Sequence, residues 1–154
     1  MNNEVVDLIQ SKRLKNSKGY DKNNVRYSWK VSNNIRASFK YAFQGIKYSF
    51  SSQRNFRIHL ILGLLAIVLA IWLNLNSNHF AILVLTITSV LVLELVNTAI
   101  EAVVDLSIGR DFHPLAGIAK DCSAAAVLIA SISSVLIAVL LLLRPLLLRI
   151  GVNA

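Results

Sequence analysis

Three carboxylates and one carboxamide stand at helical spacing inside an apolar segment: Glu94, Asn97, Glu101 and Asp105. An α-helix turns about 100° per residue, so all four side chains fall within a sector of about 80°. A charged side chain at bilayer depth costs about 2.5–3.5 kcal/mol on insertion scales. Such residues are rare in membrane segments for this reason, and a polar stripe of this kind predicts a functional site.

The residue types of this stripe suit phosphoryl chemistry at a membrane surface. Carboxylates bind Mg²⁺, which usually retains waters and bridges to phosphates, and a desolvated carboxylate can take a proton from a hydroxyl. Glu94 lies about two turns, roughly 10 Å, deeper than Glu101. This depth difference fits a shallow metal-binding carboxylate and a deeper base that faces a lipid head group. Walker A, GxGxxG, CxxC and HExxH motifs are absent from the sequence.

The elements that carry the stripe are apolar enough to cross a bilayer. The 154 residues are 55% hydrophobic, with a mean hydropathy of +0.59. Three apolar runs, at about 58–75, 80–105 and 120–143, are long enough, once their flanks are counted, for the ~20 residues that a spanning helix needs. The first run is the shortest, and a buried core helix is its alternative interpretation. We expect an all-α membrane protein with three transmembrane helices.

A change of pattern divides the region before the first run. Residues 1–33 are polar and basic and predict a flexible cytoplasmic tail, and residues 34–154 form the membrane domain. Large apolar residues then recur at helical spacing, with lysine and arginine on other faces. This pattern predicts an amphipathic helix in the membrane interface, and a soluble helix packed on a protein core is the alternative. The apolar residues are Ile35, Phe39, Phe43, Ile46 and Phe50.

Most of the positive charge precedes the first apolar run, where 12 of the 16 lysines and arginines lie. The positive-inside rule then places the N-terminus in the cytoplasm and the chain in the inner membrane, and three crossings leave the C-terminus outside. Arg144 and Arg149 oppose this bias but are outnumbered. A basic region beside membrane spans typically meets anionic head groups, so we expect no nucleic-acid partner.

Several stretches resemble the small integral-membrane prokaryotic diacylglycerol kinase and undecaprenol kinase family, over about residues 36–143. They are Glu94-Leu-Val-Asn-Thr-Ala-Ile-Glu-Ala-Val-Val-Asp105, His113-Pro-Leu-Ala-Gly-Ile-Ala-Lys120-Asp121, Ser38-Phe-Lys-Tyr-Ala-Phe-Gln-Gly45 and Arg54-Asn-Phe-Arg-Ile-His59. The resemblance implies a homotrimer of three-span protomers that transfers the γ-phosphoryl group of ATP to a lipid hydroxyl. The lipid would be diacylglycerol, giving phosphatidic acid, or undecaprenol, giving undecaprenyl phosphate.

The resemblance also implies a role for each site residue. Glu94 matches the catalytic base and Glu101 a ligand of Mg²⁺. Gln53 stands where the family usually has a glutamate as the second metal ligand, so an uncharged amide oxygen would replace a carboxylate. Nucleotide contacts are implied for Tyr41, Gln53, Glu101, Asp111, Phe112, His113, Lys120 and Asp121. Lipid contacts are implied for Glu94, Asn55, Phe56 and Arg57, and supporting roles for Asn97 and Asp105.

A second class of function stays open from the residues alone. A non-enzymatic oligomeric membrane protein, such as a small ion pathway, could also use a polar stripe. A conducting pathway would need polar residues through the whole thickness of the membrane, whereas residues 80–93 include no charged side chain. This distribution favours an interfacial site and the lipid kinase.

Overall fold

The computed structural model describes residues 34–109 and 111–151 of the chain. The expected flexible tail, residues 1–33, lies outside the described residues. The chain divides into two units, Met1–Ser38 and Phe39–Ala154. In the described part of the first unit, the Asn34 side chain accepts a hydrogen bond from the backbone N–H of Ala37 (2.8 Å), which is the usual way that an asparagine caps the start of a helix.

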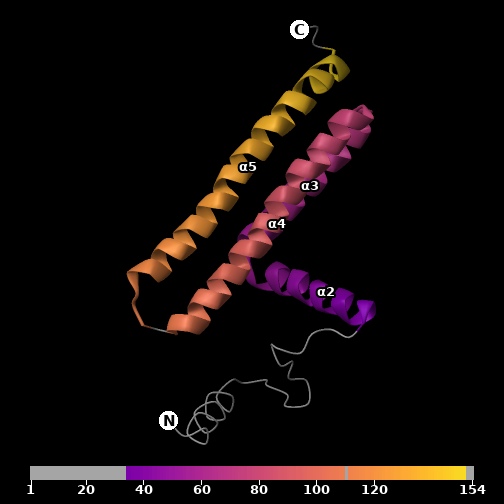
Figure 1. The fold of residues 1–154 in the computed structure, drawn as a ribbon. Helices are drawn as coiled ribbons and strands as arrows, with labels where there is room; N and C mark the ends of the chain where they lie inside the picture. The colour runs from indigo at the N-terminus through magenta and orange to yellow at the C-terminus, as the bar shows by residue number, and fades with distance from the viewer. Residues whose placement is uncertain (1–33, 110, 152–154) are drawn as a thin grey trace, which may run out of the picture. The chain divides into compact units, whose positions relative to one another are not determined.

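The described residues form helices only, as the sequence predicts for an all-α protein (Figure 1). The helices are α2 (Ile35–Ser52), α3 (Arg54–Trp72), α4 (Ser77–Ile108) and α5 (Pro114–Arg149). Three of them, α3, α4 and α5, are long and apolar enough to cross a membrane. The prediction of three spanning helices is therefore confirmed.

Short connections with specific backbone chemistry separate the helices. Asn74 adopts a left-handed φ of 53°, a conformation that asparagine tolerates better than most residues. Asn76 then caps α4 by accepting from the backbone N–H of His79 (2.9 Å). At the other end of α4, Gly109 has a φ of 64°, and Pro114 occupies the first turn of α5, where its missing N–H costs nothing.

The helix bounds differ from the expected spans at two places. The first span, expected at 58–75, corresponds to α3, which begins at Arg54 and ends at Trp72. The next three residues are apolar at two positions but form the turn around Asn74, so composition alone extends the span too far. The third span, expected at 120–143, lies within the longer α5, which continues through Pro145 to Arg149.

Helix α4 packs along both α5 and α3, whereas α3 and α5 contact each other over a short stretch. The apolar core, formed by Ala70, Leu83 and Leu142, lies at the end of the bundle near the α3–α4 turn. Most other large apolar side chains are exposed, including Leu65, Leu85 and many on α5. An exposed apolar surface of this extent suits contact with lipid or with other membrane helices.

A glycine allows α3 and α4 to approach closely. A Cβ atom at Gly63 would lie 2.6 Å from Ile87 Cγ2, and this methyl group cannot swing away freely because it is attached to a branched Cβ. Small residues at such crossings are typical of helices that pack in membranes.

We therefore expect Gly63→Ala to lower the free energy of unfolding by about 1–3 kcal/mol, the usual cost of overpacking. This loss should appear although alanine favours a helix by about 1 kcal/mol over glycine. Unfolding in mixed detergent micelles, followed by circular dichroism, measures it. Gly45→Ala is the control, because no atom lies within 4 Å of a Cβ there. Equal behaviour of the two variants would contradict the close contact.

Candidate active site

The centre of the site is the Glu101 carboxylate, which accepts hydrogen bonds from two side-chain amide groups. Gln53 Nε2, just before α3, donates to Glu101 Oε2 (3.2 Å). Asn97 Nδ2, one turn earlier on α4, donates to Glu101 Oε1 (3.1 Å). Both oxygens of the carboxylate are therefore engaged, and its orientation is fixed. Hydrogen bonds to a charged acceptor are among the stronger ones in proteins.

The network extends from Asn97 to the third spanning helix. Ser123 Oγ on α5 lies 2.6 Å from Asn97 Oδ1 and 2.9 Å from the carbonyl oxygen of Lys120, and Asn97 and Ser123 are both buried. Because an ionised Glu101 can only accept, the Nδ2 group of Asn97 faces Glu101 and its Oδ1 faces the Ser123 hydroxyl. The polar contacts thus connect α3, α4 and α5 at one level of the bundle.

The donor set around Glu101 fits a magnesium ion that is shared with phosphates. Among residues 34–109 and 111–151, no group of three or more His, Cys, Asp or Glu side chains could hold a metal alone. Mg²⁺ is usually bound by only one or two carboxylates, with substrate phosphates and water completing its shell. Rotation of the Gln53 amide would turn its oxygen toward Glu101, and one carboxylate and one amide oxygen are hard ligands of the preferred kind.

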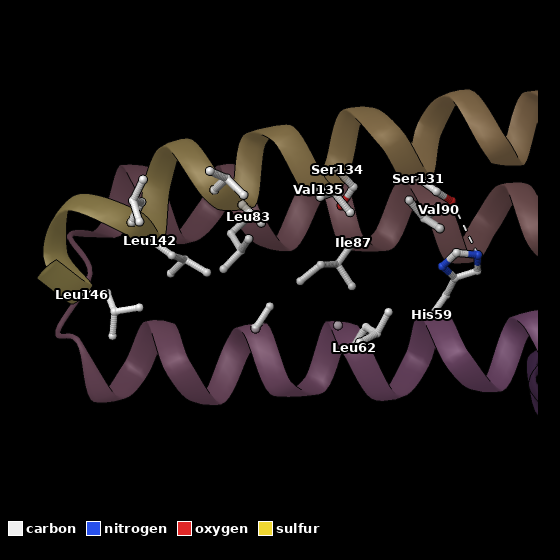
Figure 2. Close-up of a pocket in the computed structure, with 15 residues that line it drawn as sticks. His59, Leu62, Leu83, Ile87, Val90, Ser131, Ser134, Val135, Leu142 and Leu146 are labelled. Carbon is white, nitrogen blue, oxygen red and sulfur yellow. Dashed lines mark hydrogen bonds between the residues drawn. The ribbon is translucent and has the colours of Figure 1, made fainter.

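Glu94 lies deeper in the bundle and is almost fully buried, with 3% of its side chain exposed. Its carboxylate faces the imidazole of His59 on α3, with 3.5 Å between Oε1 and Nε2. The same Nε2 lies 3.5 Å from Ser131 Oγ on α5, as Figure 2 shows. Because the Ser131 hydroxyl already donates to the carbonyl of Val127 (2.8 Å), Nε2 faces two acceptors. We infer that this nitrogen carries the proton.

A cavity of about 400 Å³ begins at this imidazole and continues between the three spanning helices. His59 and Ser131 are at its polar end (Figure 2). The remaining lining is almost wholly aliphatic and includes Leu62, Ile87 and Leu142. A pocket with an apolar wall and a few polar groups at one end suits an amphiphilic ligand.

Asp105 and Lys120 form an ion pair between the end of α4 and the start of α5. The side chains are 61% and 38% exposed, respectively, so the pair contributes little to stability. Lys120 therefore remains accessible to a ligand in solvent, while Asp105 holds it beside the polar end of the bundle.

The other predicted site residues lie outside this network. Asp111, Phe112, His113 and Asp121 are exposed, and His113 is the residue before the first turn of α5. Tyr41 is half-buried on α2.

The residues predicted to contact lipid differ in their environments. Asn55 is exposed and Phe56 is buried. The Arg57 guanidinium donates to the carbonyls of Phe50 and Ser51, each at 3.2 Å. Arg57 therefore satisfies the C-terminal end of α2, a role that its sequence position does not suggest.

Three residues with contacts to the site were not predicted: His59, Ser123 and Ser131. His59 contacts Glu94, Ser123 contacts Asn97 and Ser131 contacts His59, each from a different helix, so helical spacing along α4 could not reveal them. One signal was present for His59, since it is the only histidine within the described α3 and polar side chains inside spanning helices usually have partners.

Comparison with known proteins supports a single assignment. A sequence model of the family "Prokaryotic diacylglycerol kinase" matches residues 40–142. A diacylglycerol kinase of Synechocystis is 50% identical over 120 residues, which are 78% of this chain and 69% of the relative. The diacylglycerol kinase of Escherichia coli K12 is 40% identical over 96 residues, 62% of this chain and 78% of the relative.

A relative with a different printed substrate also matches. The undecaprenol kinase of Bacillus subtilis is 36% identical over 114 residues, which cover 74% of this chain and 92% of the relative. The family match includes α3, α4 and α5 as far as residue 142. The chain therefore belongs to the prokaryotic diacylglycerol kinase family and is a membrane lipid kinase, as the sequence predicts.

Proposed function

We propose that the protein transfers the γ-phosphoryl group of ATP to the hydroxyl of diacylglycerol or undecaprenol, with Glu94 as the general base. The observation that carries this proposal is the position of Glu94. It is a buried carboxylate that contacts His59, the residue at the polar end of the apolar cavity, and it is on the same helix as the solvent-side carboxylate Glu101. A lipid hydroxyl and a nucleotide could meet between these two groups.

The two carboxylates divide the reaction between them. They are about 10 Å apart along the axis of α4, which leaves space for the hydroxyl and the phosphoryl group. The lipid oxygen attacks the γ-phosphorus, its proton passes to Glu94, and the bond from phosphorus to the leaving ADP oxygen breaks. Positioning and charge stabilisation account for most catalysis in phosphoryl transfer, so an extended motif is not required.

Glu101 and the Gln53 amide oxygen would hold Mg²⁺ together with the ATP phosphates. Negative charge shifts between the transferred phosphoryl group and the leaving group during the reaction, and a bound Mg²⁺ would neutralise this charge. Lys120 would pair with phosphate oxygens, and Asn97 and Asp105 would support Glu101 and Lys120. Further nucleotide contacts are proposed for Tyr41, Asp111, Phe112, His113 and Asp121.

The lipid would lie with its hydroxyl at Glu94 and its tail in the cavity between α3, α4 and α5. The aliphatic lining of this cavity supports the proposal, since a hydrocarbon chain gains free energy from leaving water or replaces other lipid without cost. Phe56 and Asn55 lie at the entrance to α3, where a head group would pass, and Arg57 lies beside them.

The site would face the cytoplasm of an inner-membrane protein, because ATP must reach Glu101. The basic N-terminal region supports this orientation, which leaves the C-terminus outside. Phe39, Phe43 and Phe50 of α2 are exposed and suit a helix lying in the interface.

A homotrimer is supported by exposed small residues on α5, such as Ala125 and Ser133, which allow close approach of helices in lipid.

Glu94→Gln tests the base directly, because glutamine keeps the shape of the side chain but cannot accept the proton. Purified protein with Mg-ATP labelled at the γ-phosphate should label a lipid alcohol, and the variant should lose turnover by about 10²–10⁴-fold. Ser89→Ala, an exposed position on α4, is the control. Diacylglycerol and undecaprenol are assayed side by side to identify the substrate. Unchanged turnover in Glu94→Gln would remove this residue from the base role.

Gln53→Glu tests the metal site. A second carboxylate beside Glu101 should lower the Mg²⁺ concentration for half-maximal activity by about tenfold, since affinity rises with ligand charge. Gln53→Leu should raise that concentration. Titration of activity with Mg²⁺ at saturating ATP measures both. If Glu and Leu change the Mg²⁺ requirement equally, Gln53 serves the network only through its N–H donor.

His59 should act as a positioning residue that holds one oxygen of Glu94 and leaves the other for the lipid proton. We expect His59→Leu to lower kcat on the order of tenfold, the scale of a misplaced reacting group, with the KM for ATP unchanged. His59→Gln retains an N–H donor and should recover most of this loss. Equal losses in the Leu and Gln variants would show that the contact with Glu94 is incidental.

A further inference from the structure

Besides the apolar cavity, a second pocket, which is partly polar, lies at the opposite end of the spanning helices from Glu101. Its volume is about 690 Å³, and the α3–α4 turn and the last turns of α5 form its walls. Arg144, Arg149 and His79 line it together with the carboxamides of Asn74 and Asn76, and leucines complete the wall. Every polar side chain named here can donate a hydrogen bond, so the pocket is suited to an acceptor-rich, anionic ligand.

The positive charge of this pocket is not balanced by carboxylates in the neighbouring segments of the sequence. Residues 58–93 and 122–151 include no aspartate or glutamate, and the described carboxylates all lie at the level of Glu94 or on the Glu101 side of it. The C-terminal dipole of α5 favours a cation in the last turn, which accounts for Arg149 but not for Arg144, which precedes that turn. Arg144 and Arg149 are both exposed, so their guanidinium groups are accessible to an anion from outside these segments.

One of the two guanidinium groups is already oriented. The Arg149 guanidinium lies over the indole of Trp72, 5.3 Å from the ring centre. A cation–π contact of this kind restricts the position of the guanidinium without using its N–H donors in hydrogen bonds to the ring, and such donors can match two oxygens of a phosphate.

The depth of the pocket in the membrane indicates which phosphate-bearing molecule would occupy it. Helix α3 has 19 residues, so its ends are about 28 Å apart, close to the ~30 Å thickness of the hydrocarbon core. Gln53, bonded to Glu101, precedes one end of α3, and Trp72 is at the other. The pocket then lies at the head-group level of the opposite leaflet, where phospholipid phosphates are concentrated and where leucines would contact acyl chains.

We propose that this pocket binds the phosphate of an anionic phospholipid in the leaflet opposite to the phosphoryl-transfer site. Arg144 and Arg149 lie beyond residues 40–142, the stretch that the family model matches, whereas Asn74, Asn76 and His79 of the same pocket lie within it. Its occupant is a structural lipid, distinct from the lipid that is phosphorylated, and its binding does not depend on kinase activity.

Trp72 provides the test, since the only other tryptophan, Trp29, can be replaced by phenylalanine. The Trp29→Phe protein is reconstituted in phosphatidylcholine vesicles that contain brominated phosphatidylglycerol or, separately, brominated phosphatidylcholine. Bromine quenches a nearby indole, so a phosphatidylglycerol molecule in the pocket should quench Trp72 more strongly. We expect the binding constant of phosphatidylglycerol to exceed that of phosphatidylcholine by about fivefold or more.

The paired substitution Arg144→Gln with Arg149→Gln should abolish the preference for phosphatidylglycerol. The same variant should still phosphorylate lipid, and this activity shows that it is folded. Lys40→Gln with Lys47→Gln removes the same charge from α2 and should leave the preference intact. Glycerol phosphate, added on both sides of the membrane, should not reduce the quenching by phosphatidylglycerol. Displacement by glycerol phosphate would assign the pocket to a soluble anion, and equal quenching by the two lipids would overturn the proposal.

Discussion

The hydrogen bonds that meet at Glu101 are the constraint on which the polar end of the bundle depends. A buried polar side chain has no bulk water to satisfy it, so its partners must come from the protein. Asn97 is buried and has Glu101 and Ser123 as partners, whereas Glu101 is half-buried and accepts from Gln53 and Asn97. Among the described residues, no buried side-chain nitrogen or oxygen lacks a partner. One carboxylate thereby determines how the three spanning helices are placed at this level.

The same constraint separates the bundle into two functional regions. Apolar packing around Ala70, Leu83 and Leu142 joins the helices at one end, and hydrogen bonds join them at the other. Helices α3 and α5 are both held by α4 but contact each other little, and the cavity with His59 at its polar end lies between them. Leu83 and Leu142 belong to the apolar core and also line this cavity, so a lipid tail in the cavity would pack directly against the core.

Helical spacing predicted the stripe on α4 because one helix contains all of its members. The fold class followed from the length of the apolar runs. The contacts of Glu94 with His59 and of Asn97 with Ser123 could not be predicted in this way, since they depend on the register between helices. That register is set by close packing at sites such as Gly63 against Ile87. Composition also placed the end of the first span too late. Helix α3 ends at Trp72, before the turn at the left-handed Asn74, whereas the apolar run continues to Leu75.

The distribution of charge gives each end of the molecule a preference for a different ligand. Carboxylates and amides gather where a metal–nucleotide complex would bind, whereas the opposite end has arginines and no side-chain carboxylate. In the proposed orientation, Arg144 and Arg149 oppose the positive-inside bias of the rest of the chain. The contact of the Arg149 guanidinium with the Trp72 ring and the pocket beside it offer a physical reason for these arginines. An anionic head group at this end would compensate their charge and so stabilise the orientation that the active site requires.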